Sequence, residues 1–351
     1  MNDAISRLPI FRMVPAHMLT QAIEIAMTPF EVGPGETLLV EGESDDSLMV
    51  VLSGKLEVLV DDIPIAMLGP GELVGDMALF SRDPRRTASV VTREPCSLVL
   101  IEKTGIDAMR AHGNALVPVL ETQALRTIGK RLRSMDEAIT DLAHGTELEA
   151  PPQPATEGLF NRLKGLFGGT REAPEEQVTP KPWEVLKNSP AFRSMEAEEL
   201  AGIAELMTLR KLEIGEVLLR EGEHGRDAYV LASGQMDVYR TTRSLGYEKV
   251  AEMKPGSFFG LVSMVHGSVR TASCVAGADT WVLCLPEAAW SQISEGGTPE
   301  SEGLRRALYD SLSDQLHNAN HHVAYLKKHL AGGAVGERER EHFGGLLEHT
   351  L

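Results

Sequence analysis

The stretch Gly71–Val90, GELVGDMALFSRDPRRTASV, decides how the fold of this chain is interpreted. It reads as the end of a strand, a glycine, one short helical turn, a basic pair, small hydroxyl-bearing residues and another strand. Backbone N–H groups at the start of a helix favour anions, and an arginine a few residues later can bridge two oxygens of one phosphate. The stretch therefore predicts a place to hold a single phosphate group.

A related stretch returns in the second half of the chain, at Gly256–Val275, GSFFGLVSMVHGSVRTASCV. The Ser-Gly pair at 53–54 returns at 233–234, a shift of 180 positions, and the Arg-Thr-Ala-Ser run at 86–89 returns at 270–273, a shift of 184. A shift that changes only across hairpins and loops is typical of a duplicated fold. The sequence therefore predicts two copies of one domain.

The composition narrows the class of protein. A length of 351 residues accommodates two domains, and a formal net charge of -17 argues against charge-driven binding to nucleic acid or anionic lipid. The three cysteines show no C-x-x-C spacing, which favours buried free thiols in a reducing compartment. Neither a signal peptide nor an apolar run long enough to span a membrane is present, so we expect a cytoplasmic protein.

Short period-two runs separated by glycine turns predict a mixed α+β fold with two antiparallel β-roll (jelly-roll-like) domains. Each roll is expected to be flanked by N-terminal helices and a long C-terminal helix. The predicted boundaries are 1–143 for the first domain, with its long helix at 115–143, 144–182 for a Pro/Gly/Glu-rich linker, 183–330 for the second domain and 331–351 for a flexible tail.

The long helix at 115–143 carries an apolar seam in which residues step alternately by three and four: Leu125, Ile128, Leu132, Met135, Ile139 and Leu142. Such a seam is found both in helices that pack on their own domain and in symmetric coiled-coil dimers. The dimer is the favoured interpretation, and it predicts a homodimer through the long helices. A second long helix, at 301–330, also carries a leucine-rich stripe.

Within the linker, the segment 159–167, LFNRLKGLF, places its apolar residues on one helical face. A helix this short is marginal by itself, so the segment is expected to dock on something. Docking on one of this chain's own domains, on a groove of a protein partner, or weakly on a membrane surface all stay open, with the membrane contact not favoured.

The order of elements resembles the cyclic nucleotide-binding domain family, which includes bacterial catabolite activators and the regulatory subunits of protein kinase A. The resemblance covers 8–143 and 183–330, and its most specific part is the phosphate-binding cassette. In the family this cassette runs Phe/Leu-Gly-Glu, two or three apolar residues, a short loop and Arg-x-Ala-Ser/Thr. The first copy here has VGDMAL at 74–79 and RTAS at 86–89.

The resemblance implies a set of ligand-binding residues in the first copy: Gly75, Asp76, Met77, Ala78, Arg86, Thr87 and Ala88. The family's arginine bridges the cyclic phosphate, and Arg86 is favoured over Arg85 because Thr-Ala-Ser follows it in both copies. Arg85 is then expected to face solvent or an acidic neighbour such as Asp83. The family's glutamate accepts from the ribose 2′-hydroxyl, and Asp76 has about 1.5 Å less reach at that position.

The second copy departs further, since Leu261 stands where the family has its glutamate. Losing the partner of a buried ribose hydroxyl costs on the order of 1–3 kcal/mol, so weak binding or none is expected there. The possible degenerate site comprises Gly260, Leu261, Arg270 and Thr271. Arg270 could hold an anion or form a structural pair with a carboxylate.

Two functions are compatible with these features. The first is a non-enzymatic sensor of a cyclic nucleotide, of the cAMP or cGMP type, that signals through its long helices and linker to a protein partner. The alternative is a ligand-independent dimeric scaffold built on degenerate domains. Because no basic helix-turn-helix follows either long helix, DNA binding is not expected. A kinase-regulatory subunit is disfavoured because few residues precede the first roll.

No catalytic residues and no metal site are predicted. His317, His321 and His322 lie on the last helix, with the first two at i, i+4 spacing. No acidic or cysteine companion stands beside them in the sequence, so a solvated helix face is the favoured interpretation.

Overall fold

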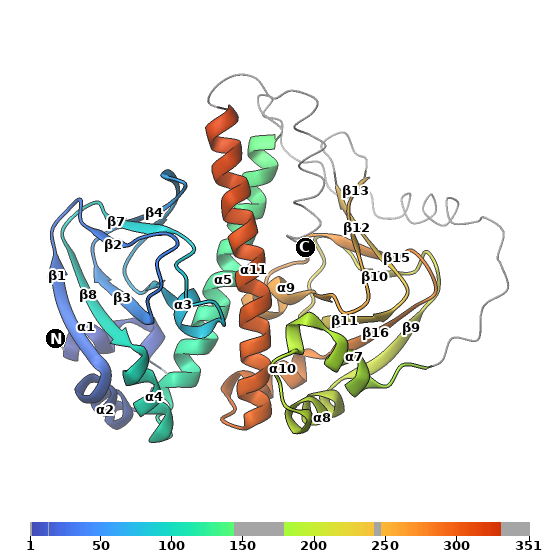
Figure 1. Cartoon of the computed structure of the whole chain (residues 1–351), viewed down its shortest axis with the longest axis horizontal. Coiled ribbons are helices and arrows are strands. Elements are labelled where there is room, and N and C mark those ends of the chain that lie inside the picture. The colour runs from blue at the N-terminus through green and yellow to red at the C-terminus, as the bar shows by residue number, and fades with distance from the viewer. Residues whose placement is uncertain (1, 13, 144–178, 242–246, 331–351) are drawn as a thin grey trace. The chain divides into compact units, whose positions relative to one another are not determined.

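The computed structural model describes residues 2–12, 14–143, 179–241 and 247–330 (Figure 1). Within the chain, contacts separate two compact units, Met1–Ala143 with Gln292–Gly336, and His144–Ser291 with Glu337–Leu351. We call them unit 1 and unit 2 and describe each by itself. The segment 159–167 and the tail 331–351 lie outside the described residues.

Unit 1 contains an antiparallel β-roll made of two four-stranded sheets. Glycine turns and period-two runs in the sequence produce its short strands: β1 (Met27–Val32), β2 (Thr37–Leu39), β3 (Ser47–Ser53), β4 (Leu56–Val60), β5 (Ile63–Leu68), β6 (Leu73–Val74), β7 (Ser89–Thr92) and β8 (Cys96–Glu102). One sheet has the order β1-β8-β3-β6 and the other β2-β7-β4-β5. The side chains between them form a core that includes Val51, Leu56 and Leu98, each fully buried.

Unit 2 repeats this roll. Its strands are β9 (Thr208–Leu212), β10 (Val217–Leu219), β11 (Ala228–Ser233), β12 (Met236–Thr241), β13 (Tyr247–Met253), β14 (Phe258–Phe259), β15 (Ser273–Ala276) and β16 (Thr280–Leu285). The sheet orders are β14-β11-β16-β9 and β10-β15-β12-β13, the same as in unit 1 strand for strand. The predicted fold class and the duplication are therefore confirmed.

Helices flank both rolls. In unit 1 they are α1 (Asn2–Arg7), the 3-10 turn η1 (Pro9–Phe11), α2 (Ala16–Ala26), α3 (Asp76–Phe80), α4 (Lys103–Ala111), α5 (Leu116–Ala143) and α11 (Pro299–Leu330). In unit 2 they are α7 (Pro182–Asn188), η2 (Pro190–Phe192), α8 (Ala197–Leu206) and α9 (Leu261–His266). The boundary between the units falls inside α10 (Glu287–Glu295).

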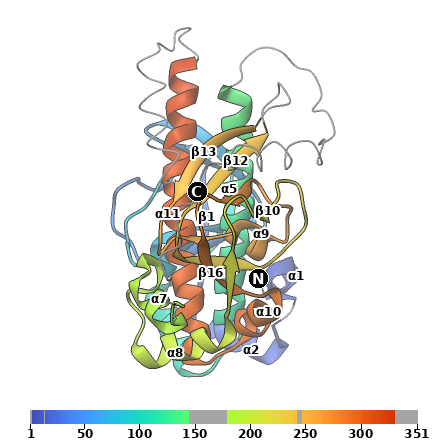
Figure 2. The same ribbon diagram turned by 90° about the vertical axis from the view of Figure 1, so that its right-hand side faces the viewer.

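The last helix, α11, follows unit 2 in the sequence but belongs to unit 1, where it packs along α5 (Figures 1 and 2). The predicted seam of α5 is buried within this single chain, with Leu125 and Ile128 fully buried. The leucine stripe of α11 is likewise buried from Leu304 to Leu326. Each helix thus covers the other's apolar face, because packing the two stripes together removes apolar surface of both from water.

Among the described residues, none of the helices is both long and apolar enough to span a membrane. The three cysteines are free thiols, as expected, with Cys96 and Cys274 buried and Cys284 half-buried. Complete burial raises the pKa of the Cys274 thiol to about 12, so this thiol is unreactive at neutral pH.

Candidate functional site

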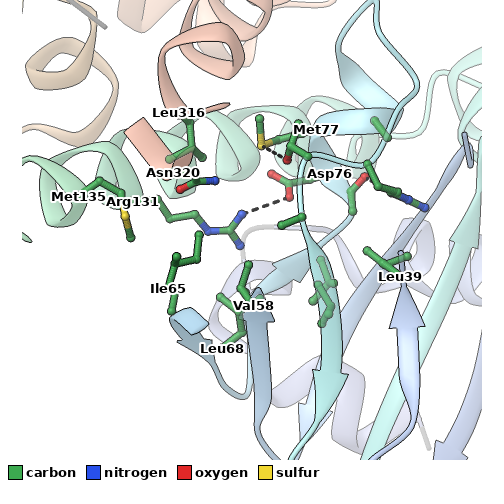
Figure 3. Close-up of a pocket in the computed structure, with 18 residues that line it drawn as sticks. Leu39, Val58, Ile65, Leu68, Asp76, Met77, Arg131, Met135, Leu316 and Asn320 are labelled. Carbon is green, nitrogen blue, oxygen red and sulfur yellow. Dashed lines mark hydrogen bonds and ion pairs between the residues drawn. The ribbon is translucent and has the colours of Figure 1, made fainter. Parts of the chain in front are cut away.

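A small cavity of about 70 Å³ lies in unit 1 between the roll, α5 and α11 (Figure 3). Its walls contain every residue that the sequence predicted for the first site, namely Gly75, Asp76, Met77, Ala78, Arg86, Thr87 and Ala88. The remaining lining residues come from the strands and from the two long helices: Leu39, Val58, Ile65, Ala66, Leu68, Val74, Val90, Arg131, Met135, Leu316 and Asn320. The cassette therefore surrounds one enclosed space.

Gly75 sets the geometry at the edge of this cavity. It precedes α3 in the left-handed conformation, with φ of 80°, which an L side chain adopts only with strain. A Cβ atom at this position would also collide with the guanidinium of Arg86 and with the carbonyl oxygen of Ser47. The glycine therefore allows both the turn into α3 and the close approach of the arginine.

Arg86 is buried, with 4% of its surface exposed, and its guanidinium is held from several sides. Nη1 donates to the carbonyl oxygen of Gly75 at 2.8 Å, and Nη2 donates to the carbonyl oxygen of Ser47 at 2.9 Å. Nη2 also forms an ion pair with Oδ2 of Asp45 at 2.6 Å. Partial burial raises the pKa of Asp45, but the hydrogen bonds from Arg86 and Ser47 outweigh it and lower this pKa overall.

Arg85 does not reach the cavity. Its guanidinium pairs with the carboxylate of Asp83 at 2.6 Å, and both side chains are more than half exposed. The expected role of Arg85, a surface pair with Asp83, is confirmed. Of the two adjacent arginines, Arg86 is the one that lines the cavity.

Asp76 is almost completely buried, with 1% exposed, and it interacts with both long helices. The hydroxyl of Tyr309, on α11, donates to Oδ2 at 2.8 Å. Nη1 of Arg131, on α5, lies 3.6 Å from Oδ1, which makes an ion pair but is too long for a hydrogen bond (Figure 3). Burial, followed by the charge of Asp76, raises the pKa of Tyr309 well above its usual value, so the phenol stays protonated as the donor.

Three buried polar atoms around the cavity have no hydrogen-bond partner: Oδ1 of Asp76, Nε of Arg86 and Nε of Arg131. Leaving such an atom unsatisfied costs about 1–3 kcal/mol, and more when the group is charged. An acceptor and two donors are thus available around one cavity. Unsatisfied charged groups grouped in this way are a feature of ligand sites rather than of packed cores.

Most of the remaining lining is apolar. Val58, Ile65 and Leu68 come from the roll, whereas Met135 and Leu316 come from α5 and α11 (Figure 3). A flat aromatic group would find hydrophobic contacts on both sides. Thr87 lies at the same wall, and its hydroxyl contacts the sulfur of Met77 at 3.5 Å.

Among the contributors that sequence reasoning missed are one residue of α5, Arg131, and three of α11: Tyr309, Leu316 and Asn320. Arg131 looked like one of several basic residues beside an apolar seam. The other three lie on α11, more than 200 residues after the cassette. The leucine stripe indicated that this helix packs on something, but no signal in the sequence identified the surface.

The second cassette has the same backbone geometry with different chemistry. Gly260 is again left-handed, with φ of 77°, and Leu261 is buried. Arg270 donates to the carbonyl oxygens of Gly260 and Asp227 and to the hydroxyl of Ser263. Burial lowers the pKa of Arg270. These hydrogen bonds are to carbonyl and hydroxyl oxygens, and Leu261 provides no carboxylate.

Comparison with known proteins agrees with this geometry. The cyclic nucleotide-binding domain family model matches residues 29–112 and 209–296, which contain both rolls and both cassettes. The chain carries two cyclic nucleotide-binding domains in tandem. The first of these domains contributes the strands of the cavity in unit 1, and the second forms most of unit 2.

Similar curated proteins include two regulatory subunits of cAMP-dependent protein kinase. The one from Yarrowia lipolytica is 23% identical over 259 residues, which cover 74% of this chain and 52% of the relative. The one from Mycosarcoma maydis is 30% identical over 290 residues, which cover 77% of this chain and 43% of the relative. The chain therefore spans about half the length of these relatives or less.

Among solved structures, the regulatory domain of Toxoplasma gondii PKA with cAMP is 18% identical. The match covers 83% of this chain and 89% of that chain, with a TM-score of 0.30.

Proposed function

We propose that the cavity of unit 1 binds a cyclic nucleotide of the cAMP or cGMP type and that the chain acts as a non-enzymatic sensor. The observation that carries this proposal is the set of unsatisfied atoms on Asp76, Arg86 and Arg131 around one partly apolar cavity. A cyclic nucleotide combines an anionic phosphate, a hydroxyl donor and a flat base, which match these three parts of the lining.

Each part of the ligand has a residue of complementary chemistry. The phosphate would accept from Arg86, with Nε as the donor that is still unused. The ribose 2′-hydroxyl would donate to Oδ1 of Asp76, which lacks a hydrogen bond. The base would lie among apolar side chains such as Val58 and Leu316.

Signalling would follow from the size of the cavity. Its volume of about 70 Å³ accommodates a few water molecules, whereas ligand pockets usually occupy about 300–1,000 Å³. Admitting a nucleotide therefore requires α5, α11 or both to move away from the roll. Ligand binding and helix position are then thermodynamically linked, so the ligand shifts the population of the two arrangements.

Calorimetric titration of the full chain with cAMP and with cGMP tests the site. Arg86→Lys keeps the positive charge but removes the planar fork, and we expect it to weaken binding at least about 10-fold. Arg85→Ala is the matched control, because Arg85 pairs with Asp83 at the surface and should leave affinity unchanged. Equal affinities for wild type and Arg86→Lys would contradict the assignment.

For the second domain we propose weak binding or none. Leu261 cannot accept from a ribose hydroxyl, and the described hydrogen bonds of Arg270 already use Nη1 and Nη2. We expect one binding event per chain in the same titration. Two events of similar affinity would contradict this part of the proposal, and no heat with either nucleotide would favour the ligand-independent scaffold.

The receiver of the signal is proposed to be a protein, with the segment 159–167 as a possible contact. Because the relatives named above are kinase regulatory subunits, a protein kinase catalytic subunit is the first partner to test. A regulator of this type should lower the phosphorylation rate of the catalytic subunit, and the cyclic nucleotide should change that effect. An unchanged rate under both conditions would exclude this partner.

A homodimer through the long helices stays a proposal of its own. Since the α5 seam is buried against α11 of the same chain, a dimer that uses this seam would have to exchange α11 between two chains. Light scattering coupled to size-exclusion chromatography would give twice the chain mass for such a dimer. A single-chain mass at all concentrations would exclude it.

A further inference from the structure

A cluster of metal-ligating side chains lies in unit 1 outside the cavity. Glu41 follows β2, Asp61 lies in the turn between β4 and β5, and His321 lies on α11. One potential ligand atom of each lies within 4.8 Å of the other two. None of the three lines the cavity, so the proposed nucleotide site does not account for them.

A second imidazole lies next to this cluster. His317 precedes His321 by one helical turn, and the two ring centroids are 4.5 Å apart at an interplanar angle of 75°. Glu41 is close enough to act electrostatically on His317. His317 is not one of the three side chains whose ligand atoms lie within 4.8 Å of one another, so it lies beside the cluster and is not counted among the ligands.

Part of the sequence prediction for these histidines is wrong. His317 is exposed, as predicted for a solvated face, but His322 is buried, with 5% exposed. Acidic side chains do lie beside His321, although none stands near it in the sequence. The fold supplies them from two loops of the first roll, about 260 and 280 residues earlier in the chain.

The distances fit one coordination shell. Nε2 of His321 lies 3.6 Å from Oε1 of Glu41. Two ligands that each bind zinc at about 2.0–2.1 Å in a tetrahedron are separated by about 3.4 Å, so a cation fits between these atoms with little movement. Nδ1 of the same ring lies 3.3 Å from Oδ2 of Asp61.

Asp61 therefore belongs, with Glu41 and His321, to one set of potential ligands. The backbone N–H of Asp61 also donates to Oε2 of Glu41 at 2.9 Å, which leaves Oε1 facing His321. Asp61 itself is left-handed, with φ of 51°, so the hairpin turn fixes its position.

The charge of the cluster favours a cation. Two carboxylates flank His321, and at most one imidazolium charge would compensate them. Arg85 pairs with Asp83, and Lys327 donates to the carbonyl oxygen of Pro64. A divalent ion would neutralise the surplus negative charge.

We propose that Glu41, Asp61 and His321 bind a divalent transition-metal ion of the zinc type. Imidazole and carboxylate ligands suit zinc, cobalt and nickel, and three protein ligands leave a fourth position for water. The ion would connect α11 to two loops of the roll. Metal binding should therefore stabilise unit 1, and the stabilisation should grow with the logarithm of the ion concentration once the site is saturated.

The experiment uses the full chain after treatment with EDTA, titrated calorimetrically with zinc chloride. One ion per chain is expected, together with a higher melting temperature. Cobalt gives a second readout, because tetrahedral nitrogen and oxygen ligation produces visible absorption without the charge-transfer band of a cysteine thiolate. That difference separates this site from binding by Cys96, Cys274 or Cys284.

Three substitutions and two matched controls locate the ion. Glu41→Gln, Asp61→Asn and His321→Ala should each weaken zinc binding at least about 10-fold. Glu43→Gln, in the same loop, and His17→Ala, on an exposed face of α2, should leave the affinity unchanged. Glu41→Gln keeps the side-chain shape, so it decides the question even if His321→Ala folds poorly.

Two results would overturn the proposal. Zinc affinity that is unchanged in both Glu41→Gln and His321→Ala would place the ion elsewhere. Absence of binding by the wild-type chain would mean that Glu41, Asp61 and His321 form an ion-pair cluster only. Neither result depends on whether the cavity binds a cyclic nucleotide.

Discussion

The hydroxyl of Tyr309 donates a 2.8 Å hydrogen bond to the carboxylate of Asp76, across 233 residues of sequence. Asp76 occupies the position at which the family recognises a ribose hydroxyl. Tyr309 therefore presents to this carboxylate the same kind of donor that a nucleotide would present. Helix α11 thus supplies a hydrogen-bond donor to this carboxylate.

Tyr309→Phe should have opposite effects on stability and on affinity. Removing the hydroxyl leaves both Asp76 oxygens without a hydrogen bond, so unfolding should become easier by about 1–3 kcal/mol. Oδ2 becomes available to the ligand, and cyclic-nucleotide affinity should rise about 2–10-fold, the value of one net hydrogen bond. Calorimetry and thermal melting measure the two effects. Tyr325→Phe on the same helix is the control. A lower affinity in Tyr309→Phe would contradict the idea that Tyr309 and the ligand compete for Asp76.

Alkaline pH should destabilise unit 1 through the same tyrosine. Burial raises the pKa of Tyr309 well above 10.0, so the folded state keeps a proton that the unfolded state loses near pH 10. The stability contributed by this group is complete below pH 10 and is lost as the pH rises above it. Above pH 10 the free energy of unfolding should decrease with pH less steeply in Tyr309→Phe than in wild type. The difference between the two slopes should be about 1.4 kcal/mol per pH unit.

The control for this slope is already present in unit 2, where burial raises the pKa of Tyr229 to about 12. Tyr309→Phe should leave that contribution intact, so part of the alkaline dependence should persist. Denaturant titrations between pH 8 and pH 11 provide the measurement. Identical slopes for wild type and variant would show that Tyr309 ionises as easily in the folded chain as in the unfolded one.

The substitution Gly75→Ala should lower the free energy of unfolding by more than the strain of the backbone conformation alone. Gly71 and Gly75 have similar positive φ values, 87° and 80°, but a Cβ at Gly71 meets nothing within 4 Å. Gly71→Ala therefore reports the conformational cost, about 1–2 kcal/mol. Gly75→Ala should have this conformational cost and should also displace Arg86, which should abolish nucleotide binding. Equal melting temperatures for the two variants would contradict the close contact between Gly75 and Arg86.

The Asp45–Arg86 ion pair should contribute modestly to stability, with a defined pH dependence. The pKa of Asp45 is lowered, so its contribution is present above pH 3.8 and is lost as the pH falls through the folded-state pKa. Because the Asp45 side chain is 41% exposed, solvent screening limits the contribution to about 1 kcal/mol or less.

The substitution Asp45→Asn tests how much this ion pair contributes to stability. Asp46→Asn, in the same loop, is its control. The Asp45 variant should melt below wild type at pH 7, and the difference should shrink as the pH falls below 3.8. A difference that persists undiminished at pH 3 would show that the asparagine disturbs packing rather than charge.

Much of the first site could be predicted from the sequence, because its residues are local. The cassette brings Gly75, Asp76 and Arg86 within a dozen positions, and a strand-turn-strand arrangement leaves few ways to place them. The same holds for the duplicated rolls, whose glycine turns and alternating strands recur with nearly constant spacing. The opposing roles of Arg85 and Arg86 also followed from the Thr-Ala-Ser run that both copies share.

Tertiary structure alone decided what covers this site. The leucine stripe of α11 showed that one helix face is buried, but an apolar stripe fits any apolar surface of suitable shape, since hydrophobic attraction is not directional. In the folded chain that surface is α5 in unit 1, and this pairing brings Tyr309 to Asp76 and His321 to Glu41. Local pattern thus specified the roll and its cassette, whereas long-range packing specified the covering helix and the histidine cluster.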